Sequence, residues 1–190
     1  MPLLKSAQAR FLGLLAALWL GVFFITRSIL LLTHLSEAQL SLGDVLRLYG
    51  EGVIYDVSFL LYALVPLALY LLLCPGWLWR KRWHLRVLQV TMTIGVFLML
   101  FTAVAEWLFW DEFGVRFNFI AVDYLVYSDE VINNILESYP VYPLLAALTI
   151  IAVITTAALQ PRVRRIAAAP LLSWPQRGVS LAGAMTTIAL

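Results

Sequence analysis

Long apolar runs separated by short polar segments dominate the pattern of this chain. Four runs, at residues 11–32, 53–73, 85–110 and 141–159, are each long enough to cross a hydrocarbon core of about 30 Å as a helix that rises about 1.5 Å per residue. A fifth run, 179–190, would give only about 18 Å of helix. The pattern predicts an all-α, polytopic membrane helix bundle over residues 1–190, with four full transmembrane helices and a partial fifth.

The ends of the first and last runs bear on how the chain is organised. The first run follows Lys5 and Arg10, but it is longer than the 7–15 or so apolar residues of a secretory signal, so we interpret it as an uncleaved signal anchor. The last run stops at Leu190 without a polar flank, which predicts that the chain is an N-terminal piece of a longer protein. A re-entrant or surface-lying C-terminal segment is the alternative.

The composition fits a lipid environment. The chain is 63% hydrophobic and 13% charged, whereas roughly a quarter of the residues of a soluble domain are charged. The single cysteine, Cys74, lies at the end of an apolar run, where we expect a small buried side chain and where no intrachain disulfide can form.

Basic residues indicate which side of the membrane each loop faces, because Lys and Arg are retained in cytoplasmic loops. If the N-terminus is cytoplasmic, the outer loops hold only Arg47 and Arg116. The cytoplasmic side then holds every other basic residue except Arg27, which falls inside the first run: Lys5, Arg10, Arg80, Lys81, Arg82, Arg86, Arg162, Arg164, Arg165 and Arg177. We expect a multi-pass protein of the bacterial cytoplasmic (inner) membrane, with the fifth helix leading toward the periplasm or exterior.

The segment 111–139 is too polar to span but rich in aromatic residues, which favours the membrane interface. Its apolar residues include stretches at helical spacing, and Ser128 is placed to cap a second helix. We expect two short helices on the outer surface, forming a lipid-headgroup cradle or a docking shelf for an external domain; a loop packed on the bundle ends is the alternative. The candidate interfacial residues are Phe117, Asp123, Tyr124 and Tyr127.

Three ionisable residues lie within or at the edge of the runs: Arg27, Asp56 and Glu106. Charge at such depth is costly, so we expect partners or water around them. Arg27 can form an internal ion pair with Asp56 or Glu106, present its guanidinium to a lipid phosphate, or extend unpaired to the interface. These three residues and Arg116 are the candidate lipid-binding residues.

Catalytic patterns are missing from the sequence. No Cys/His group has metal-ligand spacing and no glycine-rich phosphate loop occurs, while His34 and His84 fall on opposite sides in this topology. We therefore nominate no catalytic residue, no metal ligand and no cofactor in this chain, and we expect membrane lipids, not nucleic acid, as partners.

Two tracts carry a family resemblance. The tract from Glu106 to Tyr127, with the sequence EWLFWDEFGVRFNFIAVDYLVY, and the following EVINNI and ESYP motifs resemble the N-terminal membrane region of lipoteichoic acid synthase-like proteins, often labelled sulfatases. The earlier GVIYDVSF, residues 52–59, is similar to that family's second helix, more weakly. The resemblance covers most of residues 45–145.

The resemblance implies five membrane helices followed by an extracytoplasmic domain of the alkaline phosphatase and sulfatase superfamily. Such a domain uses a threonine nucleophile and a divalent metal to move a phosphoglycerol or related group from a phospholipid. This chain departs from the family by ending before that domain, so no catalytic residue is carried over. We expect a membrane-anchoring and lipid-presenting domain that works with that C-terminal domain. A small transporter or channel-like protein, or a non-catalytic assembly or sensor module, are the alternatives.

Overall fold

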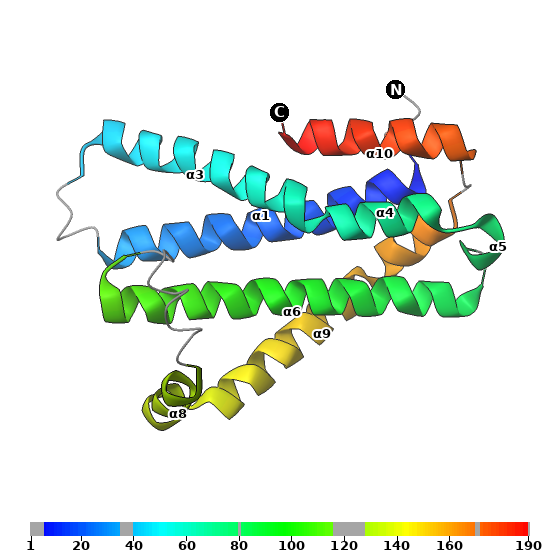
Figure 1. The fold of residues 1–190 in the computed structure, drawn as a ribbon. Helices are drawn as coiled ribbons and strands as arrows, with labels where there is room; N and C mark the ends of the chain where they lie inside the picture. Colours follow the sequence, from blue (N-terminus) through cyan, green and yellow to red (C-terminus); the bar gives the residue numbers. More distant parts are fainter. Residues whose placement is uncertain (1–5, 35–39, 80, 116–127, 170–171, 190) are drawn as a thin grey trace.

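The computed structural model describes residues 6–34, 40–79, 81–115, 128–169 and 172–189. Those residues fold into α-helices joined by short turns, and no strand occurs among them. The helices are α1 (Ala7–Thr33), α3 (Leu42–Ala63), α4 (Val65–Leu73), α5 (Gly76–Trp79), α6 (Arg82–Phe113), α8 (Ser128–Ser138), α9 (Val141–Ala167) and α10 (Trp174–Ala189) (Figure 1). The predicted all-α class is confirmed for this part of the chain.

Three helices are long and apolar enough to cross a membrane: α1 with 27 residues, α6 with 32 and α9 with 27. The pair α3 and α4 makes a fourth span if it is counted as one helix bent by 40°. The bend lies at Leu64, and Pro66 stands in the first turn of α4, where a missing N–H costs little. Helix α10 has 16 residues, or about 24 Å at the usual rise, which is shorter than a hydrocarbon core.

Helix α3 begins well before the apolar run that predicted it. Ser41 and Asp44 form a capping box: the Asp44 N–H donates to Ser41 Oγ at 3.2 Å, and the Ser41 N–H donates to Asp44 Oδ2 at 3.0 Å. This cap starts the helix at Leu42, eleven residues before the apolar run at Val53. The segment between the first two runs is therefore helical from Leu42 onward.

Helix α9 continues through Pro161, where the apolar run stops, and ends at Ala167. A proline inside a helix costs about 3 kcal/mol. Val163 and Ile166 beyond it are buried against the core of the bundle, and burying each such side chain contributes roughly 1.5–3 kcal/mol. Burial of this last turn offsets the cost of the proline.

The helices alternate in direction along the bundle. In Figure 1, α1, α6 and α10 run one way and α3, α4 and α9 the other, with α3, α4 and α10 on one side of α1 and α6 and α9 on the opposite side. Trp110, near the end of α6, donates its Nε1–H to His34 Nε2 at 3.2 Å, whereas His84 lies at the start of α6, about 39 Å away along the helix. The two histidines thus lie at opposite ends of the bundle, which we call the His34 end and the His84 end.

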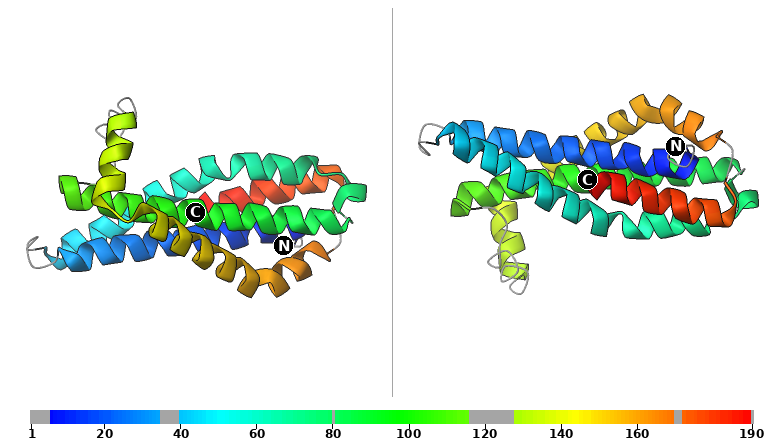
Figure 2. Two further views of the ribbon diagram at one scale, coloured as in Figure 1. Left: turned by 90° about the horizontal axis from the view of Figure 1, so that it is seen from below. Right: turned by 90° about the horizontal axis from the view of Figure 1, so that it is seen from above.

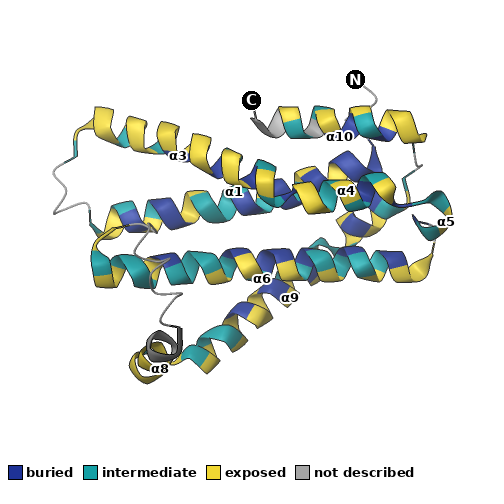
Figure 3. Cartoon of the chain, viewed as in Figure 1, coloured by how far each residue is buried: buried dark blue, intermediate teal, exposed yellow. Residues whose placement is uncertain are grey.

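Outward-facing surfaces of the long helices are largely apolar. Figure 3 shows exposed residues along the outer faces of α3 and α9, and these include Ile54, Tyr62 and Ile154. Large apolar side chains on so much of the surface are typical of a chain solvated by lipid.

One of the two short helices expected in the segment 111–139 is seen. Helix α8 begins at Ser128 and lies across the long helices at the His34 end, projecting sideways from the bundle (Figure 2). The segment predicted to form the other interfacial helix, residues 117–125, lies outside the described residues.

Candidate functional site between α1 and α3

Arg27 of α1 and Asp56 of α3 form a buried ion pair. Arg27 Nη2 donates to Asp56 Oδ2 at 2.7 Å, and the two side chains are 5% and 7% exposed. Each charge offsets the desolvation of the other, and losing either partner would leave a costly buried charge. Of the arrangements open to Arg27 in the sequence, the structure contains the internal ion pair with Asp56.

Gly52 makes room for the guanidinium. It lies one helical turn before Asp56 on the same face of α3, and a Cβ added there would overlap Arg27 Cζ, Nε and Nη2. The backbone of α3 therefore approaches the arginine more closely than any other residue type would allow. Gly52 therefore leaves the space that the Arg27 guanidinium occupies between α1 and α3.

Aromatic and hydroxyl groups close the pair from the His34 end. Tyr49, one turn before Gly52, lies 6.0 Å from Arg27 Cζ to its ring centroid and shares a 2.7 Å hydrogen bond with Ser28 Oγ. Its ring also packs 5.4 Å from that of Phe24. A face-on ring attracts a cation, so Tyr49 adds to the stabilisation of Arg27.

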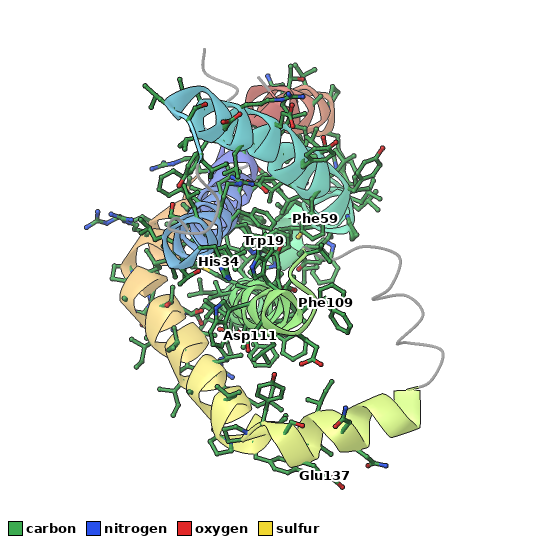
Figure 4. The ribbon with its side chains drawn as sticks, turned by 90° about the vertical axis from the view of Figure 1, so that its left-hand side faces the viewer. Trp19, His34, Phe59, Phe109, Asp111 and Glu137 are labelled. Carbon is green, nitrogen blue, oxygen red and sulfur yellow. The ribbon has the colours of Figure 1, made fainter. Side chains whose placement is uncertain are left out.

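Aromatic rings also pack between α1 and α3 on the side of the pair toward the His84 end. Trp19 and Phe59 lie toward one another between the helices, with ring centroids 6.1 Å apart, as Figure 4 shows in a view along the bundle. Phe23 meets the same Phe59 ring edge-on at 5.6 Å. The contact between α1 and α3 therefore continues on both sides of the ion pair along the helices.

One atom of the arginine is left without a hydrogen bond. Arg27 Nη1 is buried and has no acceptor in the described part of the chain. A buried unsatisfied donor costs roughly 1–3 kcal/mol, so this atom is the one point of the pair where an added acceptor would be stabilising. With Arg27 only 5% exposed, such an acceptor has no open path to it in this conformation.

The remaining predicted site residues are distributed differently. Glu106 lies on α6 and is buried, at 6% exposed. Arg116, Phe117, Asp123, Tyr124 and Tyr127 lie outside the described residues, so the proposed headgroup cradle is not placed by the structure.

The tyrosines of α3 divide into two groups. Tyr55 and Tyr62 are exposed on the outer face of the helix, whereas Tyr49 faces α1 and belongs to the ion-pair site. Gly52 and Ser28 were not recognised in the sequence as site residues. The available signal was the order Tyr49, Gly52, Asp56, whose spacing of three and four places all three on one helix face.

A second buried polar group lies at the His84 end. Tyr70 Oη shares a 3.0 Å hydrogen bond with His84 Nδ1, and the Trp79 ring packs 4.6 Å from the imidazole. Arg177 was counted in the sequence as a loop residue, but it lies in α10, is buried, and donates from Nη1 to the Cys74 carbonyl at 2.5 Å. It satisfies a terminal carbonyl of α4, where a cation also complements the helix dipole.

Cys74 is buried, as expected, and burial raises the pKa of its thiol. Within the described residues no three His, Cys, Asp or Glu side chains lie close enough together to hold a metal ion. Comparison with known proteins adds no relative: no family model, no curated protein and no solved structure matches this chain.

Proposed function

We propose that residues 1–190 are the membrane-embedded domain of a lipid-headgroup transferase or hydrolase of the sulfatase type. In this proposal α1, the bent pair α3–α4, α6 and α9 span the inner membrane, α10 starts a fifth span, and the His34 end faces outward. An extracytoplasmic catalytic domain would act on phospholipid at that surface. Anchoring it there raises the concentration of lipid that it meets.

One observation supports the anchoring role: the two ends of the helix bundle carry side chains of opposite charge. Lys81, Arg82, Arg162 and Arg165 lie at the His84 end, while Asp44, Asp111 and Glu137 lie at the His34 end. Such a division supports a fixed orientation in a membrane. The family assignment rests on the sequence tracts 106–127 and 52–59 alone.

Within this function, Arg27 acts as an internal brace between α1 and α3 and does not bind the headgroup. Its burial beside Asp56 supports this choice over the direct lipid contact that the sequence also allowed. The lipid-presenting surface would then consist of the outer segment 111–139.

Orientation can be tested with single cysteines in a Cys74→Ser background. Glu137→Cys at the His34 end should react with a membrane-impermeant maleimide in intact cells, whereas Ala168→Cys at the His84 end should react only after permeabilisation. Both positions are exposed in the fold. The reverse labelling would overturn the proposed function together with its topology.

Activity can be tested on the protein at its full natural length, purified in detergent with phosphatidylglycerol. We expect hydrolysis or transfer of the phosphoglycerol group that a metal chelator abolishes; no turnover of any phosphodiester would overturn the enzymatic part of the proposal. Arg27→Ala should lower turnover of lipid and of a small soluble phosphodiester equally, together with thermal stability. Selective loss of lipid turnover would instead assign the headgroup to Arg27.

A further inference from the structure

A pocket at the His84 end is lined by three arginines from two helices. Arg10 of α1 meets Arg162 and Arg165 of α9 around a volume of about 420 Å³, with Leu14 and Ile166 completing the wall. Small-molecule sites commonly have volumes of roughly 300–1,000 Å³. The pocket is therefore large enough for a phosphate-bearing headgroup. We call it the arginine pocket.

The charge of the arginine pocket is not balanced within the two helices that form it. Neither α1 nor α9 contains an Asp or Glu, and every acidic residue of the chain falls between Glu37 and Glu137. All three arginines are solvent-exposed, so an external anion can reach them. Three like charges around one hollow repel one another until an anion enters.

The helix dipoles do not account for all three arginines. Arg162 and Arg165 lie near the carboxyl end of α9, where a cation is favourable without any ligand. Arg10 lies in the first turns of α1, where the positive end of the dipole disfavours a cation. An anion between the two helix ends would remove this conflict.

Continuation of α9 through Pro161 builds the pocket. Because the chain stays helical, Arg162 and Arg165 are three residues apart on one face and turn toward α1, whereas Arg164 does not line the pocket. Figure 2 shows this last part of α9 beside the start of α1. A loop after Pro161 would not hold the two arginines in this register.

The lining also has an apolar side. Leu14 lies one turn further along α1 than Arg10 and is partly buried, and Ile166 is buried, so the pocket has apolar side chains beneath its cationic rim. A free phosphate ion would use only the rim, whereas a phospholipid would use both. Arginine forks match phosphate oxygens in pairs, which makes phosphate the anion best suited to the rim.

We propose that the arginine pocket binds the phosphate group of an anionic phospholipid, of the phosphatidylglycerol type, in the leaflet at the His84 end. The site lies at the opposite end from the outer segment of the proposed function. It depends on insertion in a membrane but not on an attached catalytic domain.

The test uses the purified chain in nanodiscs that contain phosphatidylcholine with or without phosphatidylglycerol, and native mass spectrometry counts the lipids retained after ejection. The wild-type chain should retain phosphatidylglycerol in preference to phosphatidylcholine. The variant Arg10→Gln/Arg162→Gln/Arg165→Gln should lose that preference by about tenfold or more, since each basic side chain near an anionic lipid contributes on the order of 1 kcal/mol.

The matched control is Arg82→Gln/Arg86→Gln/Arg164→Gln, which removes the same charge from exposed residues at the same end but outside the pocket. It should keep the preference within about twofold of the wild type if the pocket, and not the general positive charge of this end, selects the lipid. Equal loss in both variants, or no preference in the wild type, would overturn the proposal.

Two further experiments distinguish a lipid from a free anion as the ligand, and a loss of binding from a loss of folding. Inorganic phosphate at millimolar concentration should not displace the retained lipid; complete displacement would show that the pocket selects a free anion and would overturn the lipid assignment. The single variant Arg165→Gln should keep the helical circular dichroism of the wild type and lose part of the preference. These readouts stand whether or not the full-length protein turns over lipid, so failure here is distinguishable from failure of the proposed function.

Discussion

At the contact between α1 and α3 the chain buries Arg27 against Asp56, whereas at the His84 end it leaves Arg10, Arg162 and Arg165 exposed around a pocket without a carboxylate. The first arrangement satisfies its charge inside the protein, apart from Nη1. The second leaves its charge for something outside the chain. Substitutions at the two places should therefore change different quantities: stability at the buried pair and ligand binding at the arginine pocket.

The largest expected effect is at Asp56. Asp56→Ala leaves Arg27 buried without its counter-charge, and breaking a buried ion pair in this way costs about 3–5 kcal/mol of unfolding free energy. Denaturation in detergent, followed by circular dichroism, measures the loss. Glu51→Ala, which breaks the exposed pair with Arg47 on the same helix, should give no measurable change. Similar losses in the two variants would mean that the Arg27 pair is not sealed from solvent.

A smaller loss of stability is expected at Gly52, with Gly50 in the same helix as its control. Gly52→Ala forces a methyl group into the guanidinium of Arg27 and should cost about 1–3 kcal/mol, the range for overpacked sites. Gly50→Ala meets nothing within 4 Å in the same helix, so it should be neutral or stabilise by up to about 1 kcal/mol.

The same denaturation series can test the cause of the Gly52 effect. In an Arg27→Ala background the obstacle is gone, so Gly52→Ala should become as harmless as Gly50→Ala. An undiminished cost in that background would show that Gly52 is required for some reason other than Arg27.

The sequence predicted the helices more securely than their ends. Apolar length alone located α1, α6 and α9, because a stretch that must satisfy its backbone in lipid has few options besides a helix. The early start of α3 depends on the Ser41–Asp44 cap, and the extension of α9 past Pro161 depends on burial of Val163 and Ile166. Capping and tertiary burial both act outside the apolar runs, so the runs could not indicate them.

The candidate site was only partly predictable for a similar reason. The cost of charge in an apolar run pointed to Arg27 and Asp56, but the choice between Asp56 and Glu106 as partner depends on how the helices pack. The sequence does not indicate the arginine pocket, because Arg10 and Arg162 are far apart in the chain. Each of them is also explained by the retention of basic residues in cytoplasmic loops. Only the fold brings them to one hollow.

The smallest expected effect on stability is at the arginine pocket itself. Arg165 is exposed and lines the pocket without a carboxylate beside it, so Arg165→Gln in phosphatidylcholine alone should change the unfolding free energy by no more than about 0.5 kcal/mol.

Adding phosphatidylglycerol should raise the melting temperature of the wild type, because a ligand that binds the folded state stabilises it by mass action. Arg165→Gln should gain less from the lipid than Arg164→Gln, which lies one residue away but outside the pocket. If instead Arg165→Gln were as destabilising as Asp56→Ala in the absence of anionic lipid, its charge would already be satisfied within the chain, and the contrast between the buried pair and the arginine pocket would be lost.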